Sequence, residues 1–227
     1  VRRVARAAWG VTHWGPLLPS VARGASVPVG VHLDHCEDKA LIVKAMHSGF
    51  TSVMYDGSKL TLDENIENSR EIVEQAHALN IFVEGEIGFV PYDDKGEQLS
   101  GFTVPEEARR LYVESGLDWL AVSVGSIHRL ATSKAPIDFD ALKAIESICR
   151  GPLVIHGASG ISTEDFKRLK ATRVAKVNIG TVLRHTFGTA LRKEFENNPL
   201  AFDRLSLFKN PLKQVESVAF ELISALS

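Results

Sequence analysis

Short apolar runs typical of β-strands alternate with longer helical patterns along most of the chain. The predicted strands are 27–33, 52–55, 82–86, 119–123, 153–156 and 175–178. The predicted helices are 38–48, 62–79, 105–115, 138–148, 163–170, 182–197 and 212–225. Because most of these strands are continuously apolar, they predict a parallel sheet covered by helices. Both a doubly wound sheet and a (β/α)8 barrel fit this pattern.

Polar residues at the strand ends favour one of the two. Nearly every predicted strand ends in a reactive side chain or is followed closely by one: Asp34, His35, Asp56, Glu86, His128, His156 and Asn178. In a barrel, the carboxyl ends of all strands converge on one mouth. In an open sheet, only the side chains beside the switch point could meet. The sequence therefore predicts an α/β fold of the TIM (β/α)8 barrel type.

Two small Gly-containing segments follow the last two predicted strands, "HGASG" at 156–160 and "NIGT" at 178–181. TIM barrels often bind phosphate with the loops after strands 7 and 8. If these are strands 7 and 8, the run 27–33 is strand 3. The first 26 residues are too few for strands 1 and 2 with their helices, and six strands would leave two open edges. We therefore expect one barrel domain over residues 1–227 that is incomplete at its N-terminus.

The composition limits the class of protein. A net charge of −2 gives no electrostatic case for binding nucleic acid. No apolar run approaches the roughly 18 residues of a membrane helix, and no signal-peptide pattern follows the basic N-terminus. The two cysteines, Cys36 and Cys149, do not form a disulfide framework. We therefore expect a protein of the reducing cytoplasm without a membrane partner.

Three histidines lie at predicted strand ends: His35, His128 and His156. A catalytic zinc ion has three protein ligands and one open position. A lone histidine is more often a hydrogen-bonded structural residue, but three in one mouth beside acidic residues favour a metal site. The other histidines are predicted to be structural: His13, His32, His47, His77 and His185. In a regular strand His32 and His35 face opposite ways, and a bulge would change this.

Three acidic residues accompany these histidines. Asp34 suits general acid/base work on a metal-bound substrate. The alternative role, capping of the next helix, is more plausible for Asp38. Asp56 and Glu86 could hold a second metal position or orient the metal ligands. Charge balance for the histidines is an equally good explanation of these two residues.

The two Gly-containing segments could bind phosphate through backbone N–H groups beside helix N-termini. The candidate residues are Gly157, Ala158 and Ser159 in one loop, and Asn178, Ile179, Gly180 and Thr181 in the other. Either loop alone gives weak support for a phosphate site, because glycine is common after strands. The pair after the last two strands is stronger support.

Six motifs, in this order, carry a family resemblance: "VHLDH", "SVMYDGS", "EGEIG", "VSVGSIH", "LVIHGASGI" and "AKVNIGT". From about residue 26 onward the chain resembles class II, metal-dependent fructose/tagatose-bisphosphate aldolases. The resemblance implies a TIM barrel, a Zn2+ ion bound by His35, His128 and His156, and Asp34 as catalytic acid/base. It also implies that Asp56 and Glu86 are secondary metal-site residues, and that the loops 157–159 and 178–181 bind the dihydroxyacetone phosphate part.

The implied reaction is reversible aldol cleavage of a phosphorylated ketose to dihydroxyacetone phosphate and an aldehyde. Fructose 1,6-bisphosphate and tagatose 1,6-bisphosphate differ at C4, and nothing in the sequence separates them. A monovalent cation near the phosphate loops, and a homo-dimer or homo-tetramer, are implied too. A second proton donor is implied on the loop 89–103, whose acids are Asp93, Asp94 and Glu97.

The chain departs from the family pattern at three positions. Cys36 and Arg129 stand where many members have glycine, and Val182 stands where many have an acid. Arg129 could bind an acidic group of another phosphorylated keto-sugar. Two further interpretations remain. A zinc hydrolase on the same fold would require an HxH pair, which is absent. A non-catalytic aldolase-like partner subunit would be indicated by loss of metal ligands. All three histidines are present.

Overall fold

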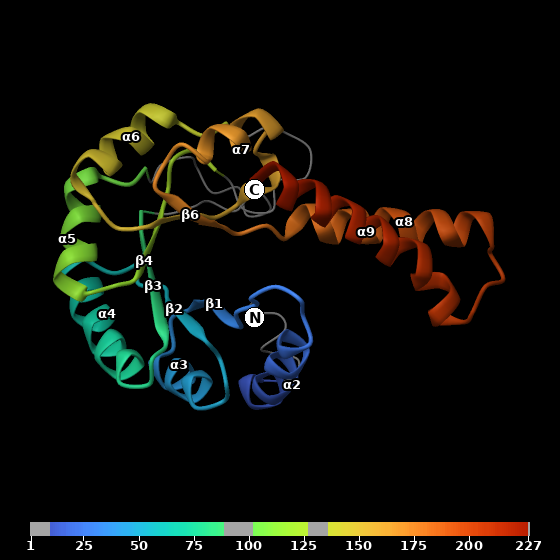
Figure 1. Ribbon diagram of the computed structural model, residues 1–227, viewed down its shortest axis with the longest axis horizontal. Helices are drawn as coiled ribbons and strands as arrows, with labels where there is room; N and C mark the ends of the chain where they lie inside the picture. Colours follow the sequence, from blue (N-terminus) through green and yellow to red (C-terminus); the bar gives the residue numbers. More distant parts are fainter. Residues whose placement is uncertain (1–9, 89–101, 127–135, 227) are drawn as a thin grey trace. The chain divides into compact units, whose positions relative to one another are not determined.

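The computed structural model describes residues 10–88, 102–126 and 136–226 (Figure 1). The contacts within the chain define two compact units. The first unit comprises Val1–Phe89, Thr103–Val122 and Ala144–Val154, and the second comprises Val90–Phe102, Ser123–Lys143 and Ile155–Ser227. No observation tests the expectation of a single barrel domain, which stays a prediction.

The described elements alternate between helix and strand, as the sequence predicts. The strands are β1 (His32–Cys36), β2 (Ser52–Tyr55), β3 (Phe82–Ile87), β4 (Trp119–Val122), β5 (Leu153–Ile155) and β6 (Val174–Val177). The helices are α2 (Val11–Arg23), α3 (Lys39–Met46), α4 (Leu62–His77), α5 (Pro105–Ser115), α6 (Phe139–Ile148), α7 (Thr163–Leu169), α8 (Thr181–Asn197) and α9 (Arg204–Leu226), with a 3-10 turn, η2 (Ala158–Gly160).

The strands form one sheet in the order β1-β2-β3-β4-β5-β6. The pairs β1–β2, β2–β3 and β3–β4 are parallel. A doubly wound sheet reverses its strand order at a switch point, whereas a barrel adds each strand beside the last. The sequential order therefore confirms the prediction of an α/β fold of TIM-barrel type, with six strands among the described residues.

Apolar side chains of the strands and helices build the core of the first unit. Leu33, Val53, Val83 and Leu120 point from neighbouring strands and are fully buried. One face of each helix supplies the other half of this core: Ile42 and Ala45 of α3, Ile72 and Ala76 of α4, and Ala108 and Leu111 of α5. These pairs are three or four residues apart, as the buried face of a helix requires. Burying one large side chain contributes about 1.5–3 kcal/mol.

Two boundaries predicted from the sequence are wrong and one helix was not predicted, and proline occurs in all three segments. Strand β1 begins at His32, not at residue 27, because Pro28 has no N–H to pair with a neighbouring strand. Helix α9 begins at Arg204, not at residue 212, and includes the buried Pro211. Helix α2 was not predicted, because Pro16 and Pro19 lie inside it.

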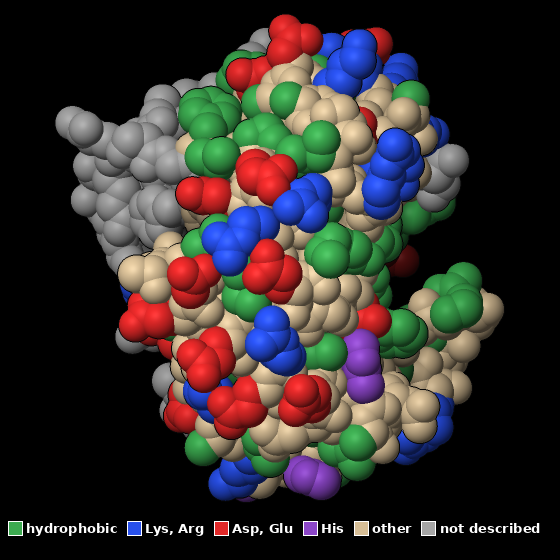
Figure 2. All heavy atoms as spheres, turned by 90° about the vertical axis from the view of Figure 1, so that its left-hand side faces the viewer, with side chains coloured by type: hydrophobic (Ala, Val, Ile, Leu, Met, Phe, Trp, Pro, Cys, Tyr) green, Lys and Arg blue, Asp and Glu red, His purple; other side chains and the backbone are tan. Residues whose placement is uncertain are grey.

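Acidic and basic side chains alternate over the side of the molecule where α4 and α5 lie (Figure 2). Some of them form exposed ion pairs, such as Arg109 with Glu106 and Arg110 with Glu114. Such pairs contribute little to stability. The mixture of signs gives this face no single-sign patch for nucleic acid. Within the described ranges, no helix is both long enough and apolar enough to cross a membrane.

Candidate metal and active site

A β-bulge at the end of β1 positions the first candidate ligand. The register with β2 shifts between Leu33 and Cys36, and His35 has a φ of 43°. This left-handed backbone is uncommon for a residue other than glycine and is often found at functional sites. The bulge interrupts the regular alternation of side-chain directions along the strand, a possibility that the sequence analysis left open for His32 and His35. It leaves the His35 side chain facing acidic residues of β3 and of the segment after β2.

His35 contacts two carboxylates of the first unit. Its Nδ1 lies 2.9 Å from Asp56 Oδ2, within hydrogen-bond distance, and 3.3 Å from Glu86 Oε2. Both acids follow or end their strands, so the parallel sheet brings them to the same edge as His35. Glu86 Oε2 is buried and accepts no hydrogen bond from the described residues, because Nδ1–H points to Asp56. A buried oxygen of this kind fits a position beside a cation.

The charges around His35 favour a cation at this site. Burial by itself lowers the pKa of His35, but Asp56, Glu86 and the negative charge of Asp34 outweigh it and raise the pKa to about 11. For Asp56, burial by itself raises the pKa, but the contacts with His35 and Ser58 together lower it to about 2. Without a metal ion the site therefore holds a proton strongly. Because metal binding displaces protons from its ligands, the same negative field would favour a divalent cation.

Supporting residues that the sequence analysis missed hold these acids in place. Ser58 donates from its Oγ (2.7 Å) and its N–H (3.3 Å) to Asp56 Oδ1. Asn65 of α4 donates to the Glu86 carbonyl at 3.0 Å. The sequence signal for the contact between Ser58 and Asp56 is the "DGS" turn, because an aspartate commonly accepts hydrogen bonds from the residue two positions later. The Asn65 contact spans β3 and α4 and has no local signal.

Asp38, and not Asp34, caps the helix after β1, whereas the catalytic role of Asp34 stays a prediction. Asp38 caps α3 by accepting a hydrogen bond from Leu41 N–H at 3.1 Å, which confirms the predicted cap. Asp34 is not used as the cap. It is buried, at 7% exposure, beside His35 in the chain. A carboxylate in this position is suited to exchange a proton with a substrate bound at the strand ends.

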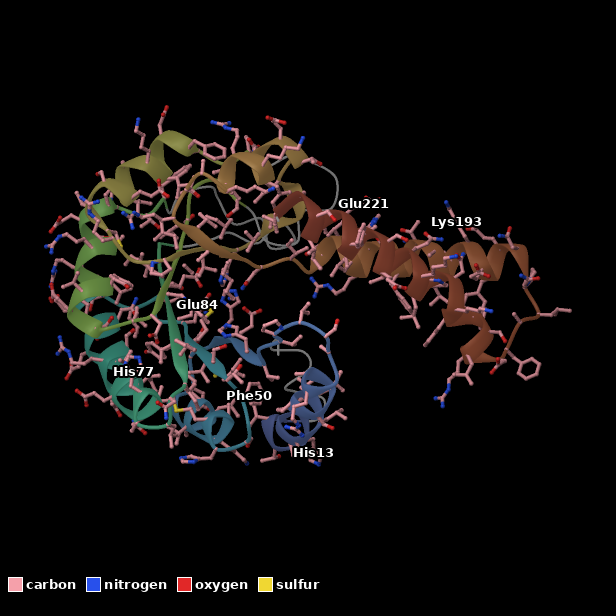
Figure 3. The ribbon with its side chains drawn as sticks, viewed as in Figure 1. His13, Phe50, His77, Glu84, Lys193 and Glu221 are labelled. Carbon is pink, nitrogen blue, oxygen red and sulfur yellow. The ribbon has the colours of Figure 1, made fainter. Side chains whose placement is uncertain are left out.

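His32 lies three residues before His35 on β1 and has a structural setting. Its Nδ1 lies 2.9 Å from Ser52 Oγ, and its Nε2 lies 3.5 Å from Glu84 Oε2. Glu84, labelled in Figure 3, is fully buried two residues before Glu86 on β3. His77, also labelled, forms an exposed pair with Asp118 at 3.0 Å. These contacts agree with the prediction that both histidines are structural.

The second unit holds another candidate histidine and both predicted phosphate loops. His156 is fully buried, and its Nε2 lies 3.0 Å from Asn178 Nδ2. Asn178 itself is fixed by a backbone hydrogen bond to Ile155 at 2.8 Å. A hydrogen-bond partner such as Asn178 orients the imidazole ring, as residues that contact a metal ligand but not the metal itself commonly do. His156 and Asn178 therefore form one supported pair at the ends of β5 and β6.

The two loops differ in their suitability for an anion. Gly157 has a positive φ of 67° and leads into η2, which contains Ala158, Ser159 and Gly160. The next helix, α7, is capped by Ser162 and has acids in its first turn, so its N-terminus is already satisfied. In contrast, α8 starts after Gly180, has no side-chain cap and has no acid in its first turn. Phosphate therefore fits the start of α8 better than that of α7.

Several predicted site residues lie outside the described part of the chain. They are His128, Arg129, Asp93, Asp94 and Glu97. Their predicted roles as a zinc ligand, an acid-binding residue and candidate proton donors stay predictions. The zinc set His35, His128 and His156 draws on this segment and on both units, so it also stays a prediction.

Within the first unit, His35, Asp56 and Glu86 fit a metal ion. Their ligand atoms lie within 4.8 Å of one another. Neighbouring ligands of a tetrahedral zinc ion are about 3.4 Å apart, given bonds of about 2.1 Å. One imidazole and two carboxylates also suit zinc and similar divalent ions. A parallel α/β sheet with such a cluster at its strand ends is typical of metal-dependent TIM-barrel enzymes.

Comparison with known proteins identifies the family. The family model described as "Fructose-bisphosphate aldolase class-II" matches residues 2–227. A sulfofructosephosphate aldolase of Alkalicoccus urumqiensis is 35% identical over 190 residues, which cover 81% of this chain and 65% of that protein. The fructose-bisphosphate aldolase of Streptococcus pneumoniae serotype 4 is 36% identical over 190 residues, covering 82% of this chain and 64% of that protein.

A solved structure agrees with this result. The YdjI aldolase of Escherichia coli K12 is 31% identical, with a TM-score of 0.83, and the match covers 98% of this chain and 79% of that one. The chain thus belongs to the class II fructose-bisphosphate aldolase family, as its motifs indicate. Members of this class are metal-dependent lyases, and the cluster around His35 is a possible metal site of that kind. The chain spans 65% and 64% of the lengths of the two relatives named above.

Proposed function

We propose that the protein is a zinc-dependent aldolase that reversibly cleaves a phosphorylated ketose to dihydroxyacetone phosphate and an aldehyde. The observation that carries the proposal is the cluster of His35, Asp56 and Glu86 at the strand ends of a class II aldolase chain. Its strongly negative surroundings suit a divalent cation. Fructose 1,6-bisphosphate and tagatose 1,6-bisphosphate are the candidate substrates.

The roles of the residues follow from the chemistry. His35, His128 and His156 would hold the zinc ion, and Asp56 and Glu86 would form its secondary position. A bound zinc ion supplies the Lewis acid that stabilises the negative charge left on the dihydroxyacetone phosphate part. Asp34 takes the proton from the C4 hydroxyl during cleavage and returns it during condensation. An acid of the loop 89–103 donates the proton to C3.

The phosphate of the substrate fits the second unit. Backbone N–H groups at 157–159 and at 178–181 would bind it, with the uncapped start of α8 contributing its positive dipole end. A monovalent cation beside these loops would balance part of the phosphate charge. We further propose, from the family resemblance, a single barrel domain, a cytoplasmic location and a homo-dimer or homo-tetramer.

A different phosphorylated keto-sugar is the second candidate substrate. The relative from Alkalicoccus urumqiensis is named a sulfofructosephosphate aldolase, so its substrate name includes an added acidic group. Arg129 could bind such a group bidentately. An assay that compares fructose, tagatose and sulfofructose phosphates separates these substrates.

The test combines metal analysis with a coupled assay for dihydroxyacetone phosphate. We expect about one zinc ion per chain, cleavage that chelators abolish, and no trapping by borohydride. Asp34→Asn should retain the metal and lose turnover, whereas Asp38→Asn, which keeps a good helix cap, should leave both unchanged. Borohydride trapping would indicate a Schiff-base lysine, and absence of metal would return the histidines to a structural role.

A further inference from the structure

Asn65 is a buried amide near the N-terminus of α4, a helix that packs against β3 in the first unit (Figure 1). Its side chain is almost completely removed from solvent. Burying an amide is costly unless its hydrogen-bonding groups are satisfied. Asn65 meets this condition at both ends of its amide, and the two ends contact different parts of the candidate metal site.

The nitrogen end of the amide holds the backbone at Glu86. Asn65 Nδ2 donates a hydrogen bond to the Glu86 carbonyl at 3.0 Å. The last paired residues of β2 and β3 are Tyr55 and Gly85. Asp56 and Glu86 therefore lie one residue beyond the pairing of these two strands. At this level, the hydrogen bond from Asn65 connects β3 to α4.

The oxygen end of the same amide lies against Gly57, the residue that follows Asp56. A Cβ atom at Gly57 would lie only 2.2 Å from Asn65 Oδ1, so the approach requires glycine. Oδ1 also accepts a hydrogen bond from Ser69 Oγ at 3.2 Å, one turn further along α4. This contact with Ser69 fixes the direction in which the amide points.

The two acids beside this amide meet at a single nitrogen atom. His35 Nδ1 lies 2.9 Å from Asp56 Oδ2 and 3.3 Å from Glu86 Oε2. Carboxylates that share a site repel each other, so their spacing depends on the backbone that carries them. Asn65 contacts that backbone on both sides, because it touches Gly57 next to Asp56 and the carbonyl of Glu86 itself.

We propose that Asn65 is a positioning residue that sets the spacing of Asp56 and Glu86 around His35, with Gly57 as the surface on which its amide lies. A fixed spacing prepares the site for a divalent cation, because residues that hold metal ligands in place commonly raise metal affinity. This consequence for the metal rests on the proposed function. The spacing itself is a property of the metal-free protein and is tested there first.

The first test is a double-mutant cycle on chelator-treated protein at pH 6, followed by thermal unfolding. In the Asn65→Ala background, Asp56→Asn should lower the melting temperature by less than about half as much as it does in the unmodified chain, because Asp56 no longer meets His35 at the right distance. The matched control background is Ile72→Val, since Ile72 is fully buried on the same helix about two turns away. There the loss should be undiminished. An undiminished loss in the Asn65→Ala background too would overturn the proposal.

Ser69→Ala replaces Asn65→Ala in this cycle if the latter variant does not fold. It removes the hydroxyl that donates to Asn65 Oδ1 and introduces a good helix former. The melting-temperature loss caused by Asp56→Asn should again be smaller than in the unmodified chain, although by less than with Asn65→Ala. If the loss in the Ser69→Ala background equals that in the unmodified chain, Asn65 does not position Asp56.

Zinc affinity, measured by competition with a chromogenic chelator, tests the consequence for the metal. Asn65→Ala and Gly57→Ala should each weaken zinc binding about tenfold or more. The double variant should bind zinc no more weakly than Asn65→Ala alone, because the alanine at position 57 then meets no amide. Ile72→Val should leave the affinity unchanged. Unchanged affinity in both single variants would contradict the spacing role, whereas an unmodified chain that binds no zinc would contradict the proposed function and leave the metal-free cycle to decide the spacing.

Discussion

The ion pair between Asp56 and His35 gives a stability prediction that can be worked from the structure. The pKa of Asp56 falls from 3.8 to about 2, because His35 and Ser58 stabilise its charge against the cost of burial. One pKa unit corresponds to about 1.4 kcal/mol, so the charge of Asp56 stabilises the metal-free protein by about 2 kcal/mol. Asp56→Asn removes the charge and keeps the shape. It should therefore lower the free energy of unfolding by about that amount.

The sign of the pH dependence follows from the two pKa shifts. A lowered carboxylate pKa gives stability that is present above pH 3.8 and lost as the pH falls towards 2. The raised pKa of His35 gives stability that is present below 6.5 and lost as the pH rises towards 11. The metal-free protein should therefore gain most from this pair between about pH 4 and 6.5. At pH 6 the Asp56→Asn variant should melt about 4–8 °C lower.

The assay is thermal unfolding of chelator-treated protein between pH 2 and 8, followed by circular dichroism. Glu37→Gln is the matched control, because Glu37 forms an exposed ion pair with Lys59, and its loss should cost under about 0.5 kcal/mol. The reasoning fails if Asp56→Asn melts within about 1 °C of the unmodified chain at pH 6. It also fails if the variant loses stability between pH 4 and 2 as steeply as the unmodified chain.

Three further substitutions test other parts of the structure. Glu86→Gln should weaken zinc binding about 10- to 100-fold, measured by competition with a chromogenic chelator, and unchanged affinity would exclude Glu86 from the metal site. Ser162→Ala should cost about 1 kcal/mol in urea unfolding, because it removes the cap of α7, whereas Ser162→Thr should cost less. Gly85→Ala should cost about 1–3 kcal/mol, because the new methyl group would lie 2.4 Å from Leu117 Cδ1; Leu117→Val in the same chain should recover part of the loss.

The strand and helix pattern could be read from the sequence wherever local signals agreed. Strand β2 and helix α5 have the predicted bounds, and β3 and β4 differ by one residue. The failures at β1, α2 and α9 all involve proline, but in opposite directions: Pro28 is excluded from β1, whereas α2 and α9 both contain proline. Proline carries a strong local preference, but tertiary packing can overrule it, as the burial of Pro211 inside α9 shows. Sequence alone does not reveal when that packing is available.

The candidate site was predictable in its members but not in its geometry. The carboxyl ends of parallel strands share one edge, so Asp34, His35, Asp56 and Glu86 could be grouped from the sequence alone. The sequence left a bulge between His32 and His35 open but did not predict it, because a positive φ is uncommon for residues other than glycine. The contact of Asn65 with the Glu86 carbonyl joins two elements that no local sequence pattern connects.

The proline that displaces the start of β1 has a further consequence for the fate of the chain in concentrated solution. Residues 27–31 read Val-Pro-Val-Gly-Val, and Val27 and Val29 are 64% and 48% exposed beside the first strand of the sheet. An exposed run of valines next to a sheet edge invites intermolecular strand pairing and aggregation. Pro28 lacks the N–H that such pairing needs, and Gly30 has low strand propensity. In a chain with these bounds the two residues thus act as gatekeepers, and replacing both by valine should make residues 27–31 more prone to aggregation.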